Sequence, residues 1–233
     1  MNLKSFGCSF IFGSELTDDG YNGPYATASQ LTWPSYLAQH INCSYSCHAH
    51  PGAGNLQITE QVLNQIGTAQ ADDVFVIGWT WVDRFDYYPV NPTDLSRSPW
   101  RTLMPIDETA LAKTYYKELH SEYRDKLVTL INIKLVIDSL RQKQIPFLMT
   151  YMDQLIFDRR WNTSPAVEDL QNFIEPCMTQ FEGMSFLEWS KKNNYPISLA
   201  WHPLEQAHRA AADYMISVFD KQKIVDPVRP ARV

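Results

Sequence analysis

Two residues far apart in the chain have the chemistry of a nucleophile and its base. Ser9 follows a short predicted strand at residues 3–7, so its hydroxyl stands where a strand turns into a helix, beside free backbone N–H groups. His202 stands next to Pro203, and an imidazole held there suits the base that a serine hydroxyl needs. Such a pair also needs hydrogen-bond donors for an oxyanion. The candidate donors are the N–H groups of Ser9 and Gly54 and the side chains of Asn55 and Thr80.

Each of these residues also has a purely structural interpretation. Serine is a preferred N-cap, so Ser9 alone could cap the helix that follows it. His202 alone could be a hydrogen-bonded histidine of the core. Ser9 in the company of Gly54, Thr80 and His202 favours the catalytic interpretation. His208 lies six residues further on, about 240° round a helix, so we interpret it as structural or as a support behind the site.

The elements that would bring these residues together alternate along the chain. Apolar runs predict strands at residues 3–7, 43–47, 73–81 and 146–152. Helical spacing predicts helices at about residues 33–41, 58–66, 108–144 (one helix or two), 167–174, 185–192 and 204–219. Strand–helix–strand units imply a parallel sheet, and therefore a single doubly wound, flavodoxin-like α/β domain over residues 1–233. A long excursion is expected at about residues 83–107, and a proline-punctuated tail from about residue 221.

Ligands of doubly wound sheets bind outside the carboxyl ends of the strands, and four short blocks stand there or just before the last helix. They are Phe-Gly-Cys-Ser-Phe at 6–10, Ala-Gly-Asn at 53–55, Gly-Trp-Thr at 78–80 and His-Pro at 202–203. In order and spacing they resemble the blocks of the SGNH/GDSL hydrolase superfamily, from residue 3 to about 219. The resemblance implies that Ser9 is the nucleophile, that His202 is the base, and that the N–H of Gly54 belongs to the oxyanion hole.

Two positions depart from the superfamily pattern. Thr80 stands where the superfamily has asparagine, which makes that oxyanion donor shorter. Leu199 stands three residues before His202, where the superfamily has its acid. Either a main-chain carbonyl near Leu199 orients the imidazole in a dyad, or another carboxylate completes a triad, or the site is weak or inactive. Of these we expect a functional but modest dyad, with the orienting oxygen on the main chain at Leu199 or Ala200. The carboxylates to be tested are Asp153, Asp158, Glu205 and Asp213, of which the last two are otherwise expected to be solvated helix positions.

The cysteines indicate neither a disulfide scaffold nor a metal site. Four cysteines in 233 residues are too sparse for a disulfide framework. Cys43 and Cys47 on one strand would have Cα atoms about 13 Å apart, too far for a disulfide, so we expect free thiols. Together with His48 and His50 they suggest zinc, but successive side chains of a strand point to opposite faces, which argues against a shared metal ion.

Residues after the third predicted strand could line a substrate pocket. Trp79, Trp81, Asp83 and Arg84 would do so there, or would instead supply core packing and an ion pair. We expect Trp79, Arg84 and Trp201 to bind substrate. Aromatic residues near the site favour a small or carbohydrate-linked acyl ester over a charged phosphodiester.

Composition narrows the class of protein further. The chain has 20 basic and 26 acidic residues, a net charge of −6, which argues against nucleic acid or an anionic membrane as partner. The first twelve residues look like a strand rather than a signal peptide, so a cytoplasmic or otherwise soluble protein is expected.

From the candidate catalytic residues and the four blocks we predict a serine esterase-type hydrolase without metal or organic cofactor. The alternatives are an acyltransferase and a non-catalytic binding or structural protein on the same fold.

Overall fold

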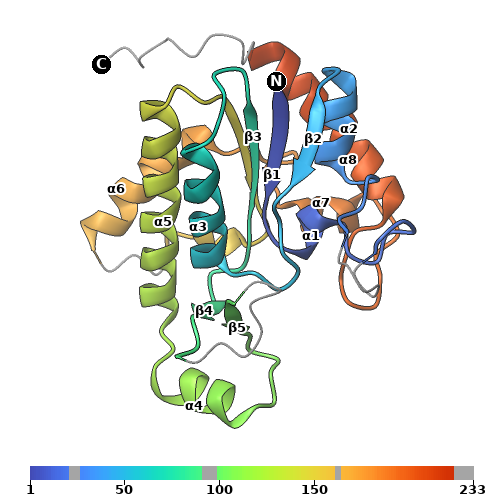
Figure 1. The fold of residues 1–233 in the computed structure, drawn as a ribbon. Helices are drawn as coiled ribbons and strands as arrows, with labels where there is room; N and C mark the ends of the chain where they lie inside the picture. The colour runs from blue at the N-terminus through green and yellow to red at the C-terminus, as the bar shows by residue number, and fades with distance from the viewer. Residues whose placement is uncertain (21–26, 91–98, 161–163, 223–233) are drawn as a thin grey trace.

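A four-stranded parallel sheet forms the centre of the molecule in the computed structural model, which describes residues 1–20, 27–90, 99–160 and 164–222 (Figure 1). Neighbouring strands pair in parallel, and their spatial order is β2-β1-β3-β6. The strands are β1 (Asn2–Phe6), β2 (Ser44–Cys47), β3 (Val74–Trp79) and β6 (Phe147–Tyr151). β3 is buried along its whole length, as expected of a central strand covered on both faces.

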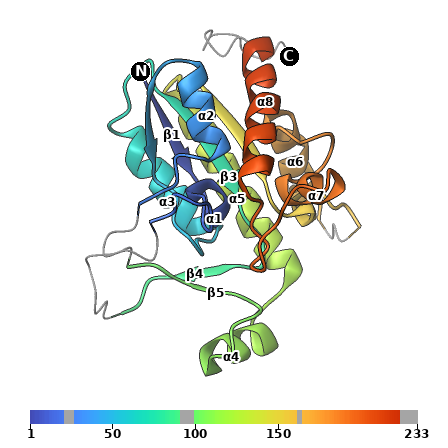
Figure 2. The ribbon, with the colours of Figure 1, turned by 90° about the vertical axis from the view of Figure 1, so that its right-hand side faces the viewer.

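Helices cover both faces of this sheet, and each face has its own apolar core (Figures 1 and 2). Figure 2 shows α2 and α8 side by side in front of the strands. One face is covered by α3 (Asn55–Ile66), α5 (Glu122–Gln142) and α6 (Pro165–Ile174), and the other by α1 (Ser9–Phe12), α2 (Trp33–His40), α7 (Phe186–Lys192) and α8 (Glu205–Gln222). The arrangement confirms the predicted doubly wound α/β fold.

The long helical segment is two helices rather than one. α4 (Ala110–Glu118) begins where the hydroxyl of Thr109 accepts the N–H of Ala112. α5 begins where the hydroxyl of Ser121 accepts the N–H of Arg124. Each side chain satisfies a backbone donor that the first turn leaves without an intrahelical acceptor, so each hydroxyl fixes a separate helix start.

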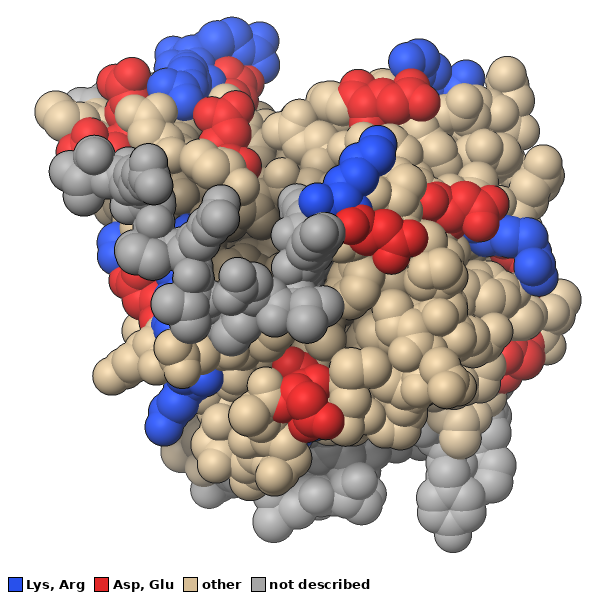
Figure 3. Space-filling view, turned by 90° about the horizontal axis from the view of Figure 1, so that it is seen from above, with Lys and Arg blue, Asp and Glu red and all other residues tan. Residues whose placement is uncertain are grey.

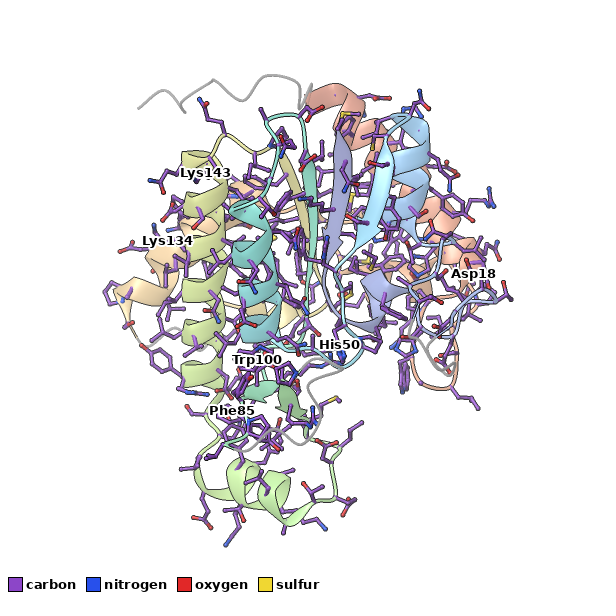
Figure 4. The ribbon with its side chains drawn as sticks, viewed as in Figure 1. Asp18, His50, Phe85, Trp100, Lys134 and Lys143 are labelled. Atoms are coloured by element: carbon purple, nitrogen blue, oxygen red, sulfur yellow. The ribbon has the colours of Figure 1, made fainter. Side chains whose placement is uncertain are left out.

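The predicted excursion contains a small antiparallel pair, β4 (Phe85–Tyr87) and β5 (Arg101–Leu103), beside α4. We call β4, β5 and α4 the insertion. It lies beyond the carboxyl ends of the central strands, and Figure 4 shows the labelled Phe85 between the sheet and α4. Leu103, Ala112 and Tyr115 form its own apolar cluster. The fold also has two short 3-10 helices, η1 (Gln154–Ile156) and η2 (Glu175–Cys177).

Some sequence-based expectations concern residues outside the described ranges. Residues 91–98 of the excursion and most of the tail, 223–233, lie outside them. The tail and the single-domain extent of residues 1–233 therefore stay predictions.

Charges of both signs are interspersed on the face seen from above in Figure 3, so that face carries no large single-sign field. No helix in the described part of the chain is long and apolar enough to cross a membrane.

Candidate active site

The backbone at the end of β1 places Ser9 on the carboxyl edge of the sheet. Gly7 has φ 156°, and a Cβ there would lie 2.9 Å from the carbonyl oxygen of Gly78, so this close approach of β1 to β3 needs glycine. Cys8 is the N-cap of α1, and Ser9 is the first residue of that helix. The interpretation of Ser9 as the cap is therefore wrong.

The loop before α8 brings His202 to this serine. Its Nε2 atom lies 2.9 Å from Oγ of Ser9, so the two predicted residues are in direct contact. The ring of Phe10 packs edge-to-face against the imidazole, with the ring centroids 5.5 Å apart. The backbone N–H of His202 donates to Oγ of Ser198 at 3.1 Å. Both neighbours restrict the imidazole, and only 6% of Ser9 is exposed.

The carboxylate that contacts His202 belongs to Glu15, and the sequence did not reveal it. Its Oε2 atom lies 2.5 Å from Nδ1 of His202 and accepts a hydrogen bond from the hydroxyl of Ser198, also at 2.5 Å. These two contacts hold the pKa of the Glu15 carboxyl below its usual range. A carboxylate at Nδ1 places the imidazole proton there and leaves Nε2 to accept the Ser9 hydroxyl proton.

The expected main-chain partner near Leu199 is therefore corrected. The side chain of Leu199 is fully exposed, and the polar partner of Nδ1 of His202 is a carboxylate instead of a carbonyl. A backbone turn explains why sequence spacing missed it. Glu15 has φ 67°, so the chain turns just after α1. The turn places the side chain of Glu15 beside His202.

The four carboxylates proposed from the sequence have other surroundings. Asp153 accepts the N–H groups of Val82 and Leu155. Asp158 pairs with Arg160, Glu205 accepts the N–H of Thr17 at 2.8 Å, and Asp213 is exposed on α8. Among the described residues, none of the four has a hydrogen bond to His202.

Two of the four predicted oxyanion donors are engaged elsewhere. The N–H of Gly54 donates to Oδ1 of Asp86 at 2.9 Å, and a Cβ at position 54 would lie 2.6 Å from that carboxylate. The side-chain amide of Asn55 donates to the carbonyls of Thr80 and Trp81, and its oxygen accepts the N–H of Thr80. These contacts make Gly54 and Asn55 part of the support that shapes the loop after β3.

Thr80 and Ser9 differ as potential donors. The hydroxyl of Thr80 is buried, and within the described ranges it has no hydrogen-bond partner. The N–H of Ser9 belongs to the first turn of α1, where no intrahelical acceptor exists for it. Within the described ranges the N–H of Ser9 has no acceptor, and of the predicted set it is the free donor that belongs to the candidate nucleophile itself.

Asp86 reaches this loop from β4 of the insertion. Its carboxylate accepts the N–H groups of Gly54 and Gln57 and the hydroxyl of Thr102, so it caps the N-terminus of α3 from outside. Burial raises the pKa of the Asp86 carboxyl, while these hydrogen bonds act in the opposite direction. Only a long-range contact places Asp86 here, and sequence spacing carried no signal for it.

The predicted substrate-binding residues separate into buried and accessible ones. Trp79 is fully buried in the core between the sheet and α3, so its side chain cannot reach a substrate, and the expectation is corrected. Trp201 is 59% exposed, and Nζ of Lys191 lies 4.0 Å from its ring centroid. Arg84 is half-buried and stacks on Trp81, with Cζ 4.8 Å from the ring centroid.

The remaining histidine and cysteine expectations concern structure. His208 is buried, and its Nδ1 accepts the backbone N–H of Trp33 at 3.2 Å, which confirms the structural interpretation. Cys43 and Cys47 are free thiols, as predicted, and so are Cys8 and Cys177. Within the described ranges, no group of three or more histidine, cysteine or acidic side chains lies close enough together to hold a metal ion.

Comparisons with known proteins point to one fold. No protein-family model and no curated protein matches the sequence, whereas solved structures do. A lipolytic protein of the G-D-S-L family from Veillonella parvula is 14% identical, with a TM-score of 0.49 and coverage of 95% of this chain and 99% of that one. The psychrotrophic esterase EstA from Pseudoalteromonas sp. is 7% identical, with a TM-score of 0.51 and coverage of 95% and 98%.

A third similar structure is the acetyl xylan esterase Est2A from the rumen bacterium Butyrivibrio proteoclasticus. It is 10% identical, with a TM-score of 0.51. The alignment covers 95% of this chain but 64% of Est2A, so this chain spans about two thirds of that protein. Likenesses at such low identity show the fold. The chain shares the α/β fold of the esterase EstA and of Est2A, and at the level of the fold this agrees with the resemblance seen in the four sequence blocks.

Proposed function

We propose that this protein is a serine esterase-type hydrolase with the triad Ser9, His202 and Glu15. The supporting observation is the unbroken line of contacts from the Ser9 hydroxyl through the imidazole to the Glu15 carboxylate, at 2.9 and 2.5 Å. A nucleophile within hydrogen-bond reach of a base that a third group orients is the arrangement that activates a serine.

Each residue has a defined part in the proposed reaction. Oγ of Ser9 attacks the ester carbonyl while Nε2 of His202 takes the hydroxyl proton. The same imidazolium then gives that proton to the leaving alkoxide, and an acyl-serine remains for water to hydrolyse. Glu15 keeps the Nδ1 proton in place and stabilises the imidazolium by its charge. The lowered pKa of Glu15 keeps that charge present at acidic pH as well.

The N–H of Ser9 is the donor best placed to form a hydrogen bond with the oxyanion of the proposed intermediate. One such donor commonly contributes about 2.7–4 kcal/mol to the lowering of the barrier. The N–H of Gly54 would serve only if Asp86 released it. We therefore expect a modest turnover number for an esterase of this fold.

For the substrate we propose a small or carbohydrate-linked acyl ester. Trp81 and Trp201 are partly exposed beside the site, and flat aromatic faces suit sugar rings and short acyl chains. The fold likeness to an acetyl xylan esterase is consistent with a carbohydrate ester.

Labelling with a fluorophosphonate tests the proposed nucleophile. Only an activated serine reacts with this probe, so the protein should be labelled and Ser9→Ala should not be. A matched control is Ser217→Ala, which removes an exposed hydroxyl of α8 that donates to the carbonyl of Tyr214. The control should be labelled like the wild type. Labelling that persists in Ser9→Ala would refute the proposal.

A non-catalytic binding protein is the second candidate, and the engaged N–H of Gly54 favours it. A protein of that kind would bind a carbohydrate ester without reacting with the fluorophosphonate. An acyltransferase would react with the probe like a hydrolase. Adding an alcohol acceptor and measuring the transferred acyl group separates these two enzymes.

A further inference from the structure

A pocket lies between the insertion and the loop after β3, on the carboxyl edge of the sheet, and neither Ser9 nor His202 lines it. It is small, with about 50 Å³ that a water-sized group could fill, and it opens to solvent. Its polar lining comes from the start of α3, the loop after β3, β4 and α5. The lining includes Asn55, Arg84, Asp86, Arg124, Asp125 and Asn132.

Arg84 is the cation of this pocket with the most unused hydrogen-bonding capacity. Its Nη1 donates to the carbonyl of Ala53 at 2.9 Å, and its guanidinium lies over the ring of Trp81. In the part of the chain that the structure describes, no carboxylate oxygen lies within 4.0 Å of it. A guanidinium has five N–H donors in a planar fork, so most of them remain available to a ligand.

The two carboxylates of the lining already have hydrogen-bond donors within the protein. Asp86 accepts two backbone N–H groups at the start of α3 as well as a hydroxyl. Asp125 accepts hydrogen bonds from Arg124, His120 and Tyr115. Because these carboxylates are engaged, Arg84 is the charged group of the lining with the most hydrogen-bonding capacity left for a ligand.

Contacts connect this pocket to the nucleophile. Trp81, on which Arg84 stacks, packs edge-to-face against Phe10, with centroids 5.5 Å apart, and Phe10 follows Ser9 in α1. The carbonyl bound by Arg84 belongs to Ala53, the residue before Gly54. A ligand that reaches from Ser9 past the ring of Trp81 would therefore meet Arg84.

We propose that this pocket binds a carboxylate carried by the substrate, with Arg84 as the specificity-determining residue. The proposal rests on the proposed esterase function and narrows it to esters that bear an acidic group several atoms from the ester bond. Planar guanidinium and carboxylate groups match in a bidentate pair, which Lys cannot reproduce.

Paired substrates test the preference. One series consists of 4-nitrophenyl monoesters of succinic, glutaric and adipic acid, and the other of neutral 4-nitrophenyl esters with equal acyl length. For at least one length, the wild type should show a kcat/KM ratio of acidic to neutral ester well above one. Arg84→Gln should lower that ratio about tenfold or more, and Arg84→Lys should restore part of it. Arg160→Gln, which removes an exposed arginine paired with Asp158, is the matched control and should leave the ratio unchanged.

A binding measurement separates this proposal from the function on which it rests. Calorimetry with glutarate and adipate, at low salt, should detect binding to the wild type and at least tenfold weaker binding to Arg84→Gln. If no ester is hydrolysed but the dicarboxylates bind to the wild type and more weakly to Arg84→Gln, the proposed esterase function is refuted. The proposal that the pocket binds a carboxylate through Arg84 is then still supported. If the wild type shows no acidic preference, or if Arg84→Gln lowers kcat/KM for acidic and neutral esters equally, Arg84 only supports the loop and the inference is overturned.

Discussion

His202 and His208 lie six residues apart and have opposite surroundings. His202 stands in the loop before α8, between a serine hydroxyl and a carboxylate, with 17% of its side chain exposed. His208 lies within α8 and is buried, with Phe186 packed edge-to-face against its ring and the N–H of Trp33 donating to its Nδ1. Burial lowers the pKa of His208 to about 3, so it is neutral at physiological pH.

The comparison shows how position decides what an imidazole can do. A histidine that must accept and release a proton needs a partner that stabilises its charged form, and Glu15 supplies this at His202. A histidine that accepts one backbone hydrogen bond inside an apolar core serves best when it never becomes charged. The first arrangement favours catalysis, and the second joins α8 to the start of α2.

Replacing each histidine by glutamine should give opposite results. His202→Gln removes the base, so kcat should fall by at least about 10³-fold while the unfolding midpoint changes little. His208→Gln should keep the ester hydrolysis of the folded protein but lower its free energy of unfolding by about 1–3 kcal/mol, because a buried hydrogen bond and its packing are disturbed. Ester hydrolysis and urea unfolding measure the two effects. If His208→Gln removed activity at a temperature where the protein is folded, the division of roles would be wrong.

Glu15→Gln tests whether the carboxylate at Nδ1 of His202 makes this histidine a base, unlike the buried His208. An amide at this position can donate to Nδ1 and so favour the wrong tautomer, and we expect kcat to fall by about 10³–10⁴-fold with little change in KM. Glu205→Gln is the matched control, since Glu205 accepts a backbone N–H near the same loop without contacting His202. It should stay within about threefold of the wild type. Equal losses in the two variants would show that Glu15 acts only through the fold.

The free energy of unfolding should fall in acid because His208 is buried in its neutral form. Its pKa is about 3 in the folded protein against an ordinary 6.5, so below pH 6.5 the unfolded chain binds a proton that the native protein excludes. The stability that neutral His208 contributes is therefore complete above pH 6.5 and is lost as the pH falls toward 3. Between pH 6.5 and 5 this group should cost the wild type about 2 kcal/mol that His208→Gln does not lose. Urea unfolding at the two pH values measures the difference, and parallel losses in both proteins would contradict it.

The four strands of the sheet, their parallel arrangement and the pair Ser9–His202 could be predicted because they depend on local signals. Apolar runs and helical spacing mark the elements, and parallel strands bring their carboxyl ends to one edge. The insertion could be predicted only as an excursion, since strands of three residues leave almost no periodic pattern. Trp79 was wrongly assigned because a strand buried on both faces does not show which side chains reach the surface.

Glu15 and Asp86 could not be predicted, for a shared physical reason. Glu15 reaches His202 through a turn with positive φ at a residue other than glycine, which no sequence pattern marks. Asp86 reaches Gly54 across 32 positions of the chain, from the three-residue strand β4. In both cases one carboxylate is positioned by tertiary contacts alone. The superfamily resemblance implied an acid at position 199, whereas the carboxylate that contacts His202 in the structure is that of Glu15, near the start of the chain.

The smallest expected effects come from the segment just before His202, and they distinguish a carboxylate from a carbonyl as the orienting group. Ser198 donates its hydroxyl to Glu15 and accepts the N–H of His202, so Ser198→Ala should loosen the pair and lower kcat about tenfold. It should also let the pKa of Glu15 rise, because the hydrogen bond from Ser198 is the main cause of its depression. Leu199→Ala removes only an exposed side chain, and its kcat should stay within about twofold of the wild type.

Leu199→Pro tests the backbone instead, because proline constrains φ in this loop. If Glu15→Gln were harmless while the backbone change at 199 was not, the main chain would orient His202 after all.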